Sequence, residues 1–400
     1  MNFVYSCLKL GLLIFTALLL LPFTIHAQSF TSPIGWHHND FDNRARALGQ
    51  TTSTLSNRNG HSLNPAAPLP EQGTFYFSSP MFSVTPYELK RDNGRLRLYN
   101  PTLAYSISNV TFRMTLDRSR FTRQEFQQSA GFQEIEQVSS LSRLNVGYAF
   151  SGRFSAGAGF TYASYSFKVR PILQQQDISG NAWGLNMGIY YRDQYNFGGV
   201  LVSPQAGLSF NDLSSGFDFD PMEWPAAMPG QIRLAYGFDI KSASSWLGRP
   251  LYSFGLYSSF AKYLARSDID PETNEVSFPS GFEAVFAGWK PVTRFDGMNY
   301  AEIPVRDQIS AGIGLEAGLA ETLFFRFGRF GGAEFWTETR TSAGIELDLY
   351  YLSFGVNRIW FDDSGIFIEP LKTITNFSFT ARIPLDGQHR KTVIGWLLDL

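Results

Sequence analysis

The amino-acid sequence predicts an all-β protein: a transmembrane β-barrel of the outer-membrane type with roughly 14 antiparallel strands and an N-terminal plug-like segment. Between residues 141 and 383, large apolar residues alternate with small, polar or charged ones, which is the period of a β-strand. The aromatic content is high, with 37 Phe, 18 Tyr and 8 Trp. A soluble sandwich explains one such strand. A barrel with aromatic residues toward lipid and a polar lumen explains the whole set.

Residues 1–27 are interpreted as a signal peptide. Lys9 precedes an apolar run over residues 10–23, and the small residue Ala27 precedes the expected cleavage site. The run is too short for a membrane-spanning helix, which needs roughly 20 residues. The only cysteine, Cys7, lies ahead of the run, which argues against a lipoprotein anchor. We expect export to the outer membrane of a Gram-negative bacterium, and a mature chain without disulfides.

Residues 28–72 differ from the rest of the chain and form the predicted plug-like segment. They are polar and rich in turn-forming residues, and the prolines within residues 64–70 exclude a central strand. The alternative is a disordered export tail. Residues 73–400 are assigned to the barrel, with the clearest alternation over residues 110–117, 232–240 and 309–316.

Two changes of phase interrupt the strand pattern. The first, near Tyr350-Tyr351, predicts a tight hairpin. The second lies between Tyr162 and Tyr165 and predicts a bulge or kink around Ala163-Ser164.

Polarity and the end of the chain suggest the remaining barrel features. Three polar stretches, residues 118–138, 264–279 and 291–307, are predicted to be extracellular loops, the first with a short helix. Residues 392–400 form a candidate closing strand that ends on Leu400, where an aromatic residue is usual. The alternative places the final strand at residues 376–383.

Charged side chains within the strands are predicted to face the lumen, because an Arg or Lys facing lipid at the bilayer midplane costs about 2–4 kcal/mol. We favour a salt-bridged network that supports the strands or holds the plug. The alternative is that Arg143, Arg233 and Arg326 line a route for an acidic headgroup. The predicted lumen-facing charges are Arg113, Asp117, Arg143, Arg233, Asp239, Glu316, Arg326, Glu346, Asp348 and Arg382.

The sequence offers no candidate catalytic residues, and we expect neither a metal nor a cofactor. His37-His38 lie beside Asp40 and Asp42, but adjacent residues of an extended segment point to opposite sides. The Gly-x-Gly fragments lie inside strands, where no helix follows to complete a phosphate loop. A net charge of −2 argues against nucleic-acid binding.

The N-terminal motif resembles that of the FadL-like superfamily of outer-membrane barrels. Residues 43–50 and then Asn64-Pro65-Ala66 look like the family's plug motif, which precedes the barrel and folds into its lumen. Gln50 and Ala67 stand where glycine is usual in the family. Two further blocks resemble the PorV-like branch, which is associated with type IX secretion: residues 206–213 with 228–234, and residues 323–330 with 343–347.

The resemblance implies competing functions. As a PorV-like barrel, the protein would dock or shuttle secreted proteins at the outer membrane, with cargo proteins or secretion components as partners beside membrane lipid. We favour this hypothesis at the sequence level. The alternative is a FadL-like transporter of hydrophobic small molecules or fatty acids. It predicts an apolar pocket near the plug and a lateral opening around Ala163-Ser164. A structural barrel without transport is a third possibility, and an open porin is disfavoured.

Overall fold

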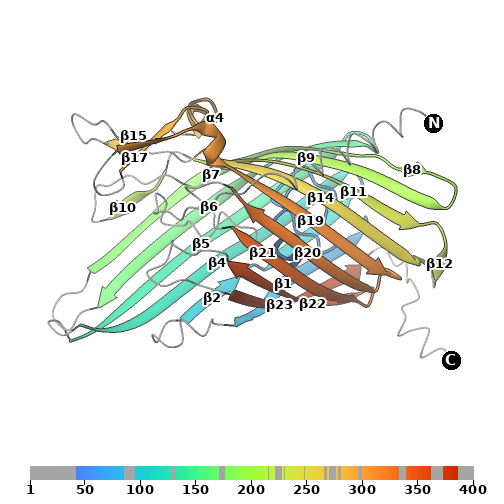
Figure 1. The fold of residues 1–400 in the computed structure, drawn as a ribbon, viewed down its shortest axis with the longest axis horizontal. Coiled ribbons are helices and arrows are strands. Elements are labelled where there is room, and N and C mark those ends of the chain that lie inside the picture. The colour runs from blue at the N-terminus through green and yellow to red at the C-terminus, as the bar shows by residue number, and fades with distance from the viewer. Residues whose placement is uncertain are drawn as a thin grey trace.

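The protein forms a closed antiparallel β-barrel of 14 strands (Figure 1), which confirms the predicted fold class. The computed structural model describes residues 42–84, 95–127, 131–170, 176–214, 216–220, 228, 230–246, 248–264, 268–269, 276–277, 281–295, 300–332, 339–361 and 373–385. The wall strands are β1 (Thr74–Val84), β2 (Arg95–Tyr99) and β3 (Thr102–Ile107) as one interrupted strand, β4 (Val110–Gln127), β5 (Gly131–Ala149), β6 (Phe154–Arg170), β7 (Gln176–Arg192), β9 (Val200–Ser214), β11 (Gln231–Ser242), β14 (Tyr252–Tyr263), β19 (Ile309–Leu319), β20 (Leu323–Gly331), β21 (Arg340–Asp348), β22 (Leu352–Phe361) and β23 (Thr373–Pro384).

The barrel closes where β1 pairs with β23, so the sheet joins its own first strand. The final wall strand is therefore the alternative that the sequence left open at residues 376–383. The candidate closing strand at residues 392–400 lies outside the described residues, as do the predicted signal peptide and His37-His38.

The two ends of the barrel differ. At one end, short turns join β3 to β4, β5 to β6, β19 to β20 and β21 to β22. The last of these turns contains Tyr350 with φ of +77°, and it confirms the predicted hairpin. We call this the short-turn end and the opposite one the long-loop end. In outer-membrane barrels, short turns face the periplasm and longer loops face outward.

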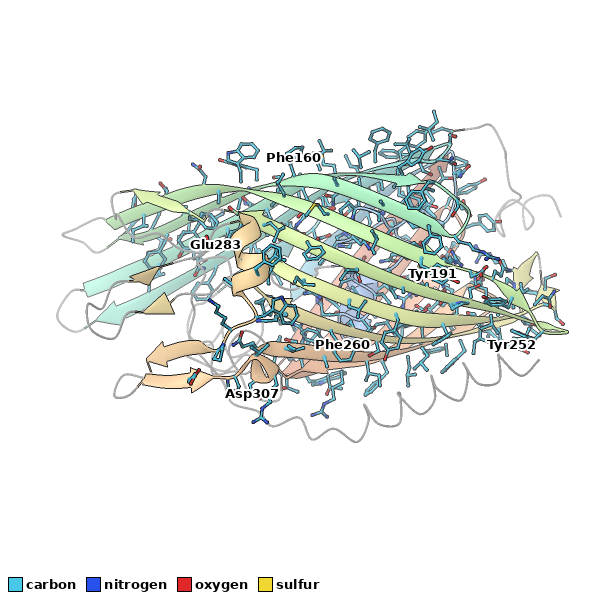
Figure 2. All side chains as sticks on the ribbon, turned by 90° about the horizontal axis from the view of Figure 1, so that it is seen from above. Phe160, Tyr191, Tyr252, Phe260, Glu283 and Asp307 are labelled. Atoms are coloured by element: carbon cyan, nitrogen blue, oxygen red, sulfur yellow. The ribbon has the colours of Figure 1, made fainter. Side chains whose placement is uncertain are left out.

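The outer wall surface is apolar. Along β4 to β7, alternate side chains point away from the barrel and are exposed, as Phe160 shows in Figure 2. An apolar band of this kind faces lipid in a transmembrane barrel. In the described part of the chain, no helix has the length and apolar character needed to cross a membrane. Exposed members of the band include Phe112, Met114, Leu144, Val146, Phe160, Trp183 and Ile189.

The predicted loop at residues 118–138 is wrong for most of its length. β4 and β5 continue as a long hairpin through these residues, with 18 and 19 residues respectively. A membrane crossing needs only about 9–11 residues per strand, so this hairpin extends beyond the lipid. There its outer surface is polar, with Arg120 and Glu136 paired at 2.7 Å, which is why polarity suggested a loop.

The other two predicted loops, together with α4 between them, form short elements that cover part of the outer wall at the long-loop end. They are β15 (Asp268–Ile269), β16 (Val276–Ser277), α4 (Gly281–Ala287), β17 (Val292–Phe295), β18 (Tyr300–Ile303) and the 3-10 helix η2 (Val305–Gln308). Glu283 of α4 and Asp307 of η2 lie outside the wall in Figure 2. Short pairings β8 (Tyr195–Asn196), β10 (Asp218–Asp220), β12 (Ser245–Trp246) and β13 (Arg249–Pro250) complete the structure.

The predicted bulge around Ala163-Ser164 is also wrong. β6 pairs without a register shift to both β5 and β7. The phase changes because Tyr165 points inward, where it covers an apolar cluster. The irregularity lies instead in β9, where the register with β7 shifts between Leu185 and Met187, and Asp212 adopts φ of +57°. This is one extra residue in β9, the signature of a β-bulge.

Candidate functional site: the filled lumen

Residues 42–72, here called the lumenal segment, lie inside the barrel. The segment begins with a single helical turn, α2 (Asn43–Ala47), whose N-cap Asp42 accepts a hydrogen bond from the backbone N–H of Ala45 at 3.0 Å. α2 contacts β20, β21, β22 and β23. Nearly every residue between Asp42 and Leu69 is buried, although many are polar. A polar segment buried in this way needs hydrogen-bond partners on the wall.

Arg113 supplies such partners to the Asn64-Pro65-Ala66 motif. Its guanidinium donates to the carbonyls of Gly60 at 2.7 Å, Asn64 at 3.3 Å and Ala67 at 3.0 Å. Asn64 in turn donates to the carbonyl of Ile189 on β7 at 2.9 Å. The motif and one of the predicted lumenal charges are therefore in direct contact.

Wall glycines leave room for the backbone of the lumenal segment. A Cβ atom added to any of them would lie 2.0–2.7 Å from an atom of the segment, closer than real Cβ atoms approach. Eight strands contribute: Gly147 (β5), Gly157 (β6), Gly188 (β7), Gly207 (β9), Gly314 (β19), Gly328 (β20), Gly344 (β21) and Gly355 (β22). These eight inward glycines thus have a common reason, which is close packing against the segment.

A tight turn follows α2, at the position where the sequence departs from the family motif. Gly49 and Gln50 both have positive φ, +62° and +64°. Gln50 thus occupies the left-handed region, which favours glycine and strains most other residues. The turn therefore holds a non-glycine residue, Gln50, in a left-handed conformation.

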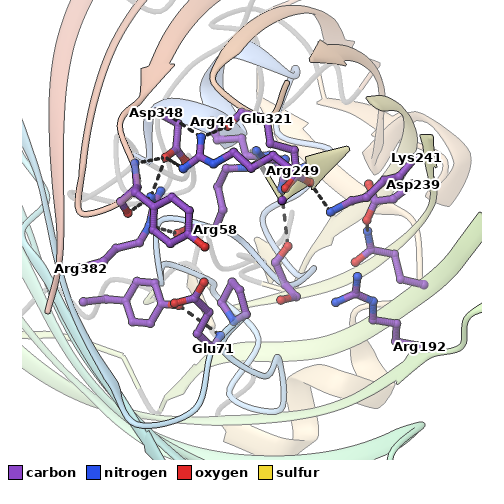
Figure 3. A pocket seen from close by; sticks show the side chains of 16 residues that line it. Arg44, Arg58, Glu71, Arg192, Asp239, Lys241, Arg249, Glu321, Asp348 and Arg382 are labelled. Atoms are coloured by element: carbon purple, nitrogen blue, oxygen red, sulfur yellow. Dashed lines mark hydrogen bonds and ion pairs between the residues drawn. The ribbon is translucent and has the colours of Figure 1, made fainter. Parts of the chain in front are cut away.

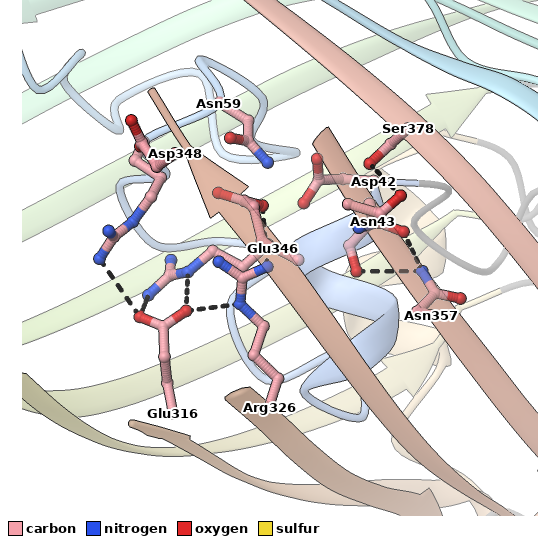
Figure 4. Close-up of polar contacts among 12 residues, drawn as sticks. Asp42, Asn43, Asn59, Glu316, Arg326, Glu346, Asp348, Asn357 and Ser378 are labelled. Atoms are coloured by element: carbon pink, nitrogen blue, oxygen red, sulfur yellow. Dashed lines mark hydrogen bonds and ion pairs between the residues drawn. The ribbon is translucent and has the colours of Figure 1, made fainter. Parts of the chain in front are cut away.

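A group of buried charges ties α2 to the wall, and Glu316 on β19 is its centre (Figure 4). Glu316 accepts from Arg44 of the lumenal segment at 3.0 Å and from Arg326 at 2.6 Å. Arg58 approaches the same carboxylate at 3.4 Å, and Arg326 also pairs with Glu346 at 2.8 Å. Asn357 adds a hydrogen bond to the carbonyl of Asn43 at 3.2 Å.

A second buried group holds the bulge in β9. Arg143 donates to Asp212 at 2.8 and 3.1 Å and pairs with Asp117 on its other side. Thr161 also donates to Asp212, at 2.7 Å, and the backbone N–H of Asp212 donates to Asn186 at 2.8 Å. The extra residue of the bulge is therefore fully hydrogen-bonded.

All ten predicted lumenal charges lie on inward faces, nine of them buried and Asp239 half-buried. Arg382 pairs with Asp348 at 3.0 Å. Asp239 accepts from Gln205 and Tyr257. The three arginines considered as a route for an acidic headgroup have separate partners, since Arg143 binds Asp117 and Asp212, Arg326 binds Glu316 and Glu346, and Arg233 bonds Gln231 at 2.8 Å.

Sequence reasoning missed Asp212, Arg44 and Arg58. Asp212 follows the inward residue Asn211 directly, so strict alternation assigns it to the outer face, and only the bulge turns it inward. Arg44 and Arg58 precede the strands, where no period marks a face. The ten predicted inward charges are five arginines and five carboxylates, so their balance gave no sign that arginines of the lumenal segment would join them.

Between Arg143 and the long-loop end, the inner wall formed by β5, β6 and β7 carries an apolar patch. Leu141, Ala163 and Ala182 are level with one another on β5, β6 and β7, and they contact Phe217 and Met228. Met228 also reaches Gly184, beside the bulge. On the outer face at the bulge, Leu213 is covered by Leu264 and by Ala284 of α4.

The fold and its interior define a transmembrane β-barrel of the outer-membrane type whose lumen contains its own N-terminal segment. No protein-family model and no curated protein sequence matches the chain.

Among solved structures, the toluene transporter TodX of Pseudomonas putida is 10% identical over 86% of this chain and 97% of its own, with a TM-score of 0.46. A FadL homologue of Pseudomonas aeruginosa is 10% identical over 86% and 98%, with a TM-score of 0.44. CdiB of Acinetobacter baumannii is 9% identical over 78% and 60%, with a TM-score of 0.40. These likenesses are too weak to carry an argument, so the classification rests on the strand pairing and the two wall faces.

Proposed function

We propose that this protein is an outer-membrane barrel that takes up hydrophobic small molecules, with the lumenal segment as a plug. This is the alternative of the two main sequence hypotheses, and it involves no enzymatic step. The observation that carries it is the apolar inner cluster around Leu141, which lies on the long-loop side of the buried ionic groups. A second apolar cluster packs the lumenal segment against the wall, but the cluster around Leu141 contains no residue of that segment.

The bulge at Asp212 supports a lateral route for such a molecule. Apolar side chains lie on both faces of the wall there, with Met228 inside and Leu213 outside. Gly184 and Gly230 add little side-chain thickness beside the bulge. An apolar molecule that reaches the inner cluster would therefore be separated from the outer face by a short stretch of irregular wall, over which α4 lies. This replaces the expected opening around Ala163-Ser164, where the pairing is continuous.

The docking hypothesis loses its main support. The blocks that resemble the PorV-like branch contain Asn211, Asp212 and Arg326, and these side chains are buried inside the barrel. They contact wall and lumenal residues and offer no surface to a secreted protein.

Equilibrium binding of the fluorescent apolar probe N-phenyl-1-naphthylamine to the purified barrel tests the proposal. Leu141→Asn places an amide in the inner cluster, and its matched control, Leu144→Asn, alters a lipid-facing residue of the same strand. Fully burying a leucine is worth about 1.5–3 kcal/mol, so we expect at least tenfold weaker binding for Leu141→Asn and unchanged binding for the control. Absence of saturable binding, or equal loss in both variants, would refute uptake. Co-purification of exported proteins in place of apolar ligand would favour docking.

A further inference from the structure

A cavity of about 370 Å³ lies between the lumenal segment and the wall (Figure 3). Its lining includes Gly248, Glu321 and Tyr350 from the turns, so it lies at the short-turn end. It is distinct from the apolar inner cluster, with which it shares no residue. Six cationic side chains line it: Arg44, Arg58, Arg192, Lys241, Arg249 and Arg382. Four carboxylates do so: Glu71, Asp239, Glu321 and Asp348.

The lining carboxylates have partners of their own, and Glu71 accepts a hydrogen bond from the Thr74 hydroxyl at 3.5 Å. Glu321 pairs with Lys241, and Asp348 serves both Arg249 at 3.5 Å and Arg382 at 3.0 Å. Asp239 accepts hydrogen bonds from two neutral groups, Gln205 and Tyr257. These contacts leave no lining carboxylate in an ion pair with Arg58 or Arg192 among the described residues.

The two remaining arginines are under-compensated. Arg58 shares Glu316 with Arg44 and Arg326, and it makes the longest of the three contacts, at 3.4 Å. Its guanidinium lies over the ring of Phe324, 3.7 Å from the centroid. Arg192 is half-buried on the inward face of β7 and makes no side-chain hydrogen bond or ion pair with any described residue. Figure 3 shows the two arginines on different sides of the cavity.

We propose that this cavity binds a small polar anion that carries a carboxylate or phosphate group, with Arg192 as its main anchor. A cationic side chain withdrawn from bulk water requires a counter-charge. The planar guanidinium fork matches carboxylate and phosphate oxygens in a bidentate manner, which a smaller halide does not reproduce. Because the lumenal segment and the wall both line the cavity, the bound anion bridges them. This site does not depend on which molecule passes through the barrel.

Isothermal titration calorimetry of the full, detergent-solubilised barrel tests the site at constant ionic strength set with sodium chloride. The two probes are succinate, as a free carboxylate, and glycerol 3-phosphate, as the soluble part of a phospholipid headgroup. The test variant is Arg192→Gln. The matched control is Arg153→Gln, which removes an exposed arginine that pairs with Asp193 near the same end of the barrel, outside the cavity.

We expect saturable one-site binding of at least one probe. Arg192→Gln should weaken it at least tenfold, and Arg153→Gln should leave it within about twofold. The tighter probe shows whether the natural anion is a free carboxylate or a phosphate headgroup. Arg192→Lys keeps the charge without the fork, and it should bind with intermediate affinity even if the Gln variant fails to fold. Lack of saturable binding by both probes, or equal weakening in the Arg153 control, would overturn the site.

Discussion

Replacement of Arg113 by methionine is expected to loosen the lumenal segment while the barrel stays closed. The side chain donates three hydrogen bonds to backbone carbonyls of the segment, at 2.7–3.3 Å. A hydrogen bond to a charged group contributes about 1.5–3 kcal/mol, but neighbouring bonds are not additive. We therefore expect the free energy that holds the lumenal segment in place to fall by about 3–4 kcal/mol. Since every 1.4 kcal/mol is tenfold, the displaced state becomes roughly 100- to 1,000-fold more populated.

The assay measures the exposure of a thiol introduced into the lumenal segment. Cys7 lies in the predicted signal peptide, so Ser62→Cys introduces one thiol into a mature chain that otherwise has none. Ser62 is buried in the lumenal segment, and its thiol should react with a water-soluble reagent only when the segment leaves its seat. We expect the labelling rate to rise roughly 100-fold or more when Arg113→Met is added.

Arg120→Met serves as the control, because Arg120 belongs to the same strand but pairs with Glu136 outside the lumen. Its labelling rate should match that of the parent. Gel electrophoresis without prior heating should show that the Arg113→Met barrel is still folded. If its labelling rate then stays within threefold of the parent, these hydrogen bonds do not hold the segment.

Three further perturbations test other parts of the structure. Gly328→Val places a side chain about 2 Å from the backbone of the lumenal segment and should accelerate the same labelling, whereas Gly152→Val, with nothing within 4 Å, should not. Asp212→Ala leaves Arg143 with Asp117 as its remaining carboxylate partner, and urea unfolding should show a loss of about 3–5 kcal/mol; a loss below 1 kcal/mol would contradict the role given to the bulge. Phe160→Arg should cost about 2–4 kcal/mol in folding into lipid vesicles, and a negligible cost would place this face away from lipid.

The barrel could be predicted from sequence because its two faces meet different solvents. Phe160 and Trp183 meet lipid while Thr161 and Gly184 point inward, so the period of two survives in every central strand. The prediction failed where the two faces of a strand no longer differ in polarity. At the long-loop end of β4 and β5 the outer face becomes polar as well, and the stretch was taken for a loop.

The lumen was only partly predictable. Inward charges such as Arg113 and Glu316 follow from strand parity, but their partners do not, because the lumenal segment has no period. Asp212 shows the limit of parity, since one positive φ moves a side chain to the other face. The cavity at the short-turn end is lined by Arg58 and Arg192, which come from distant parts of the chain, and only the fold reveals it.

The pairing of β1 with β23 imposes an order of events on assembly. The lumenal segment ends immediately before β1, and the strands that contact it extend as far along the chain as the last wall strand, β23. Once the seam is sealed, the segment is enclosed by the wall on every side. Contacts between such distant parts of a chain form slowly, because a long loop must first close. The lumenal segment must therefore already lie inside the barrel when the first and last strands pair.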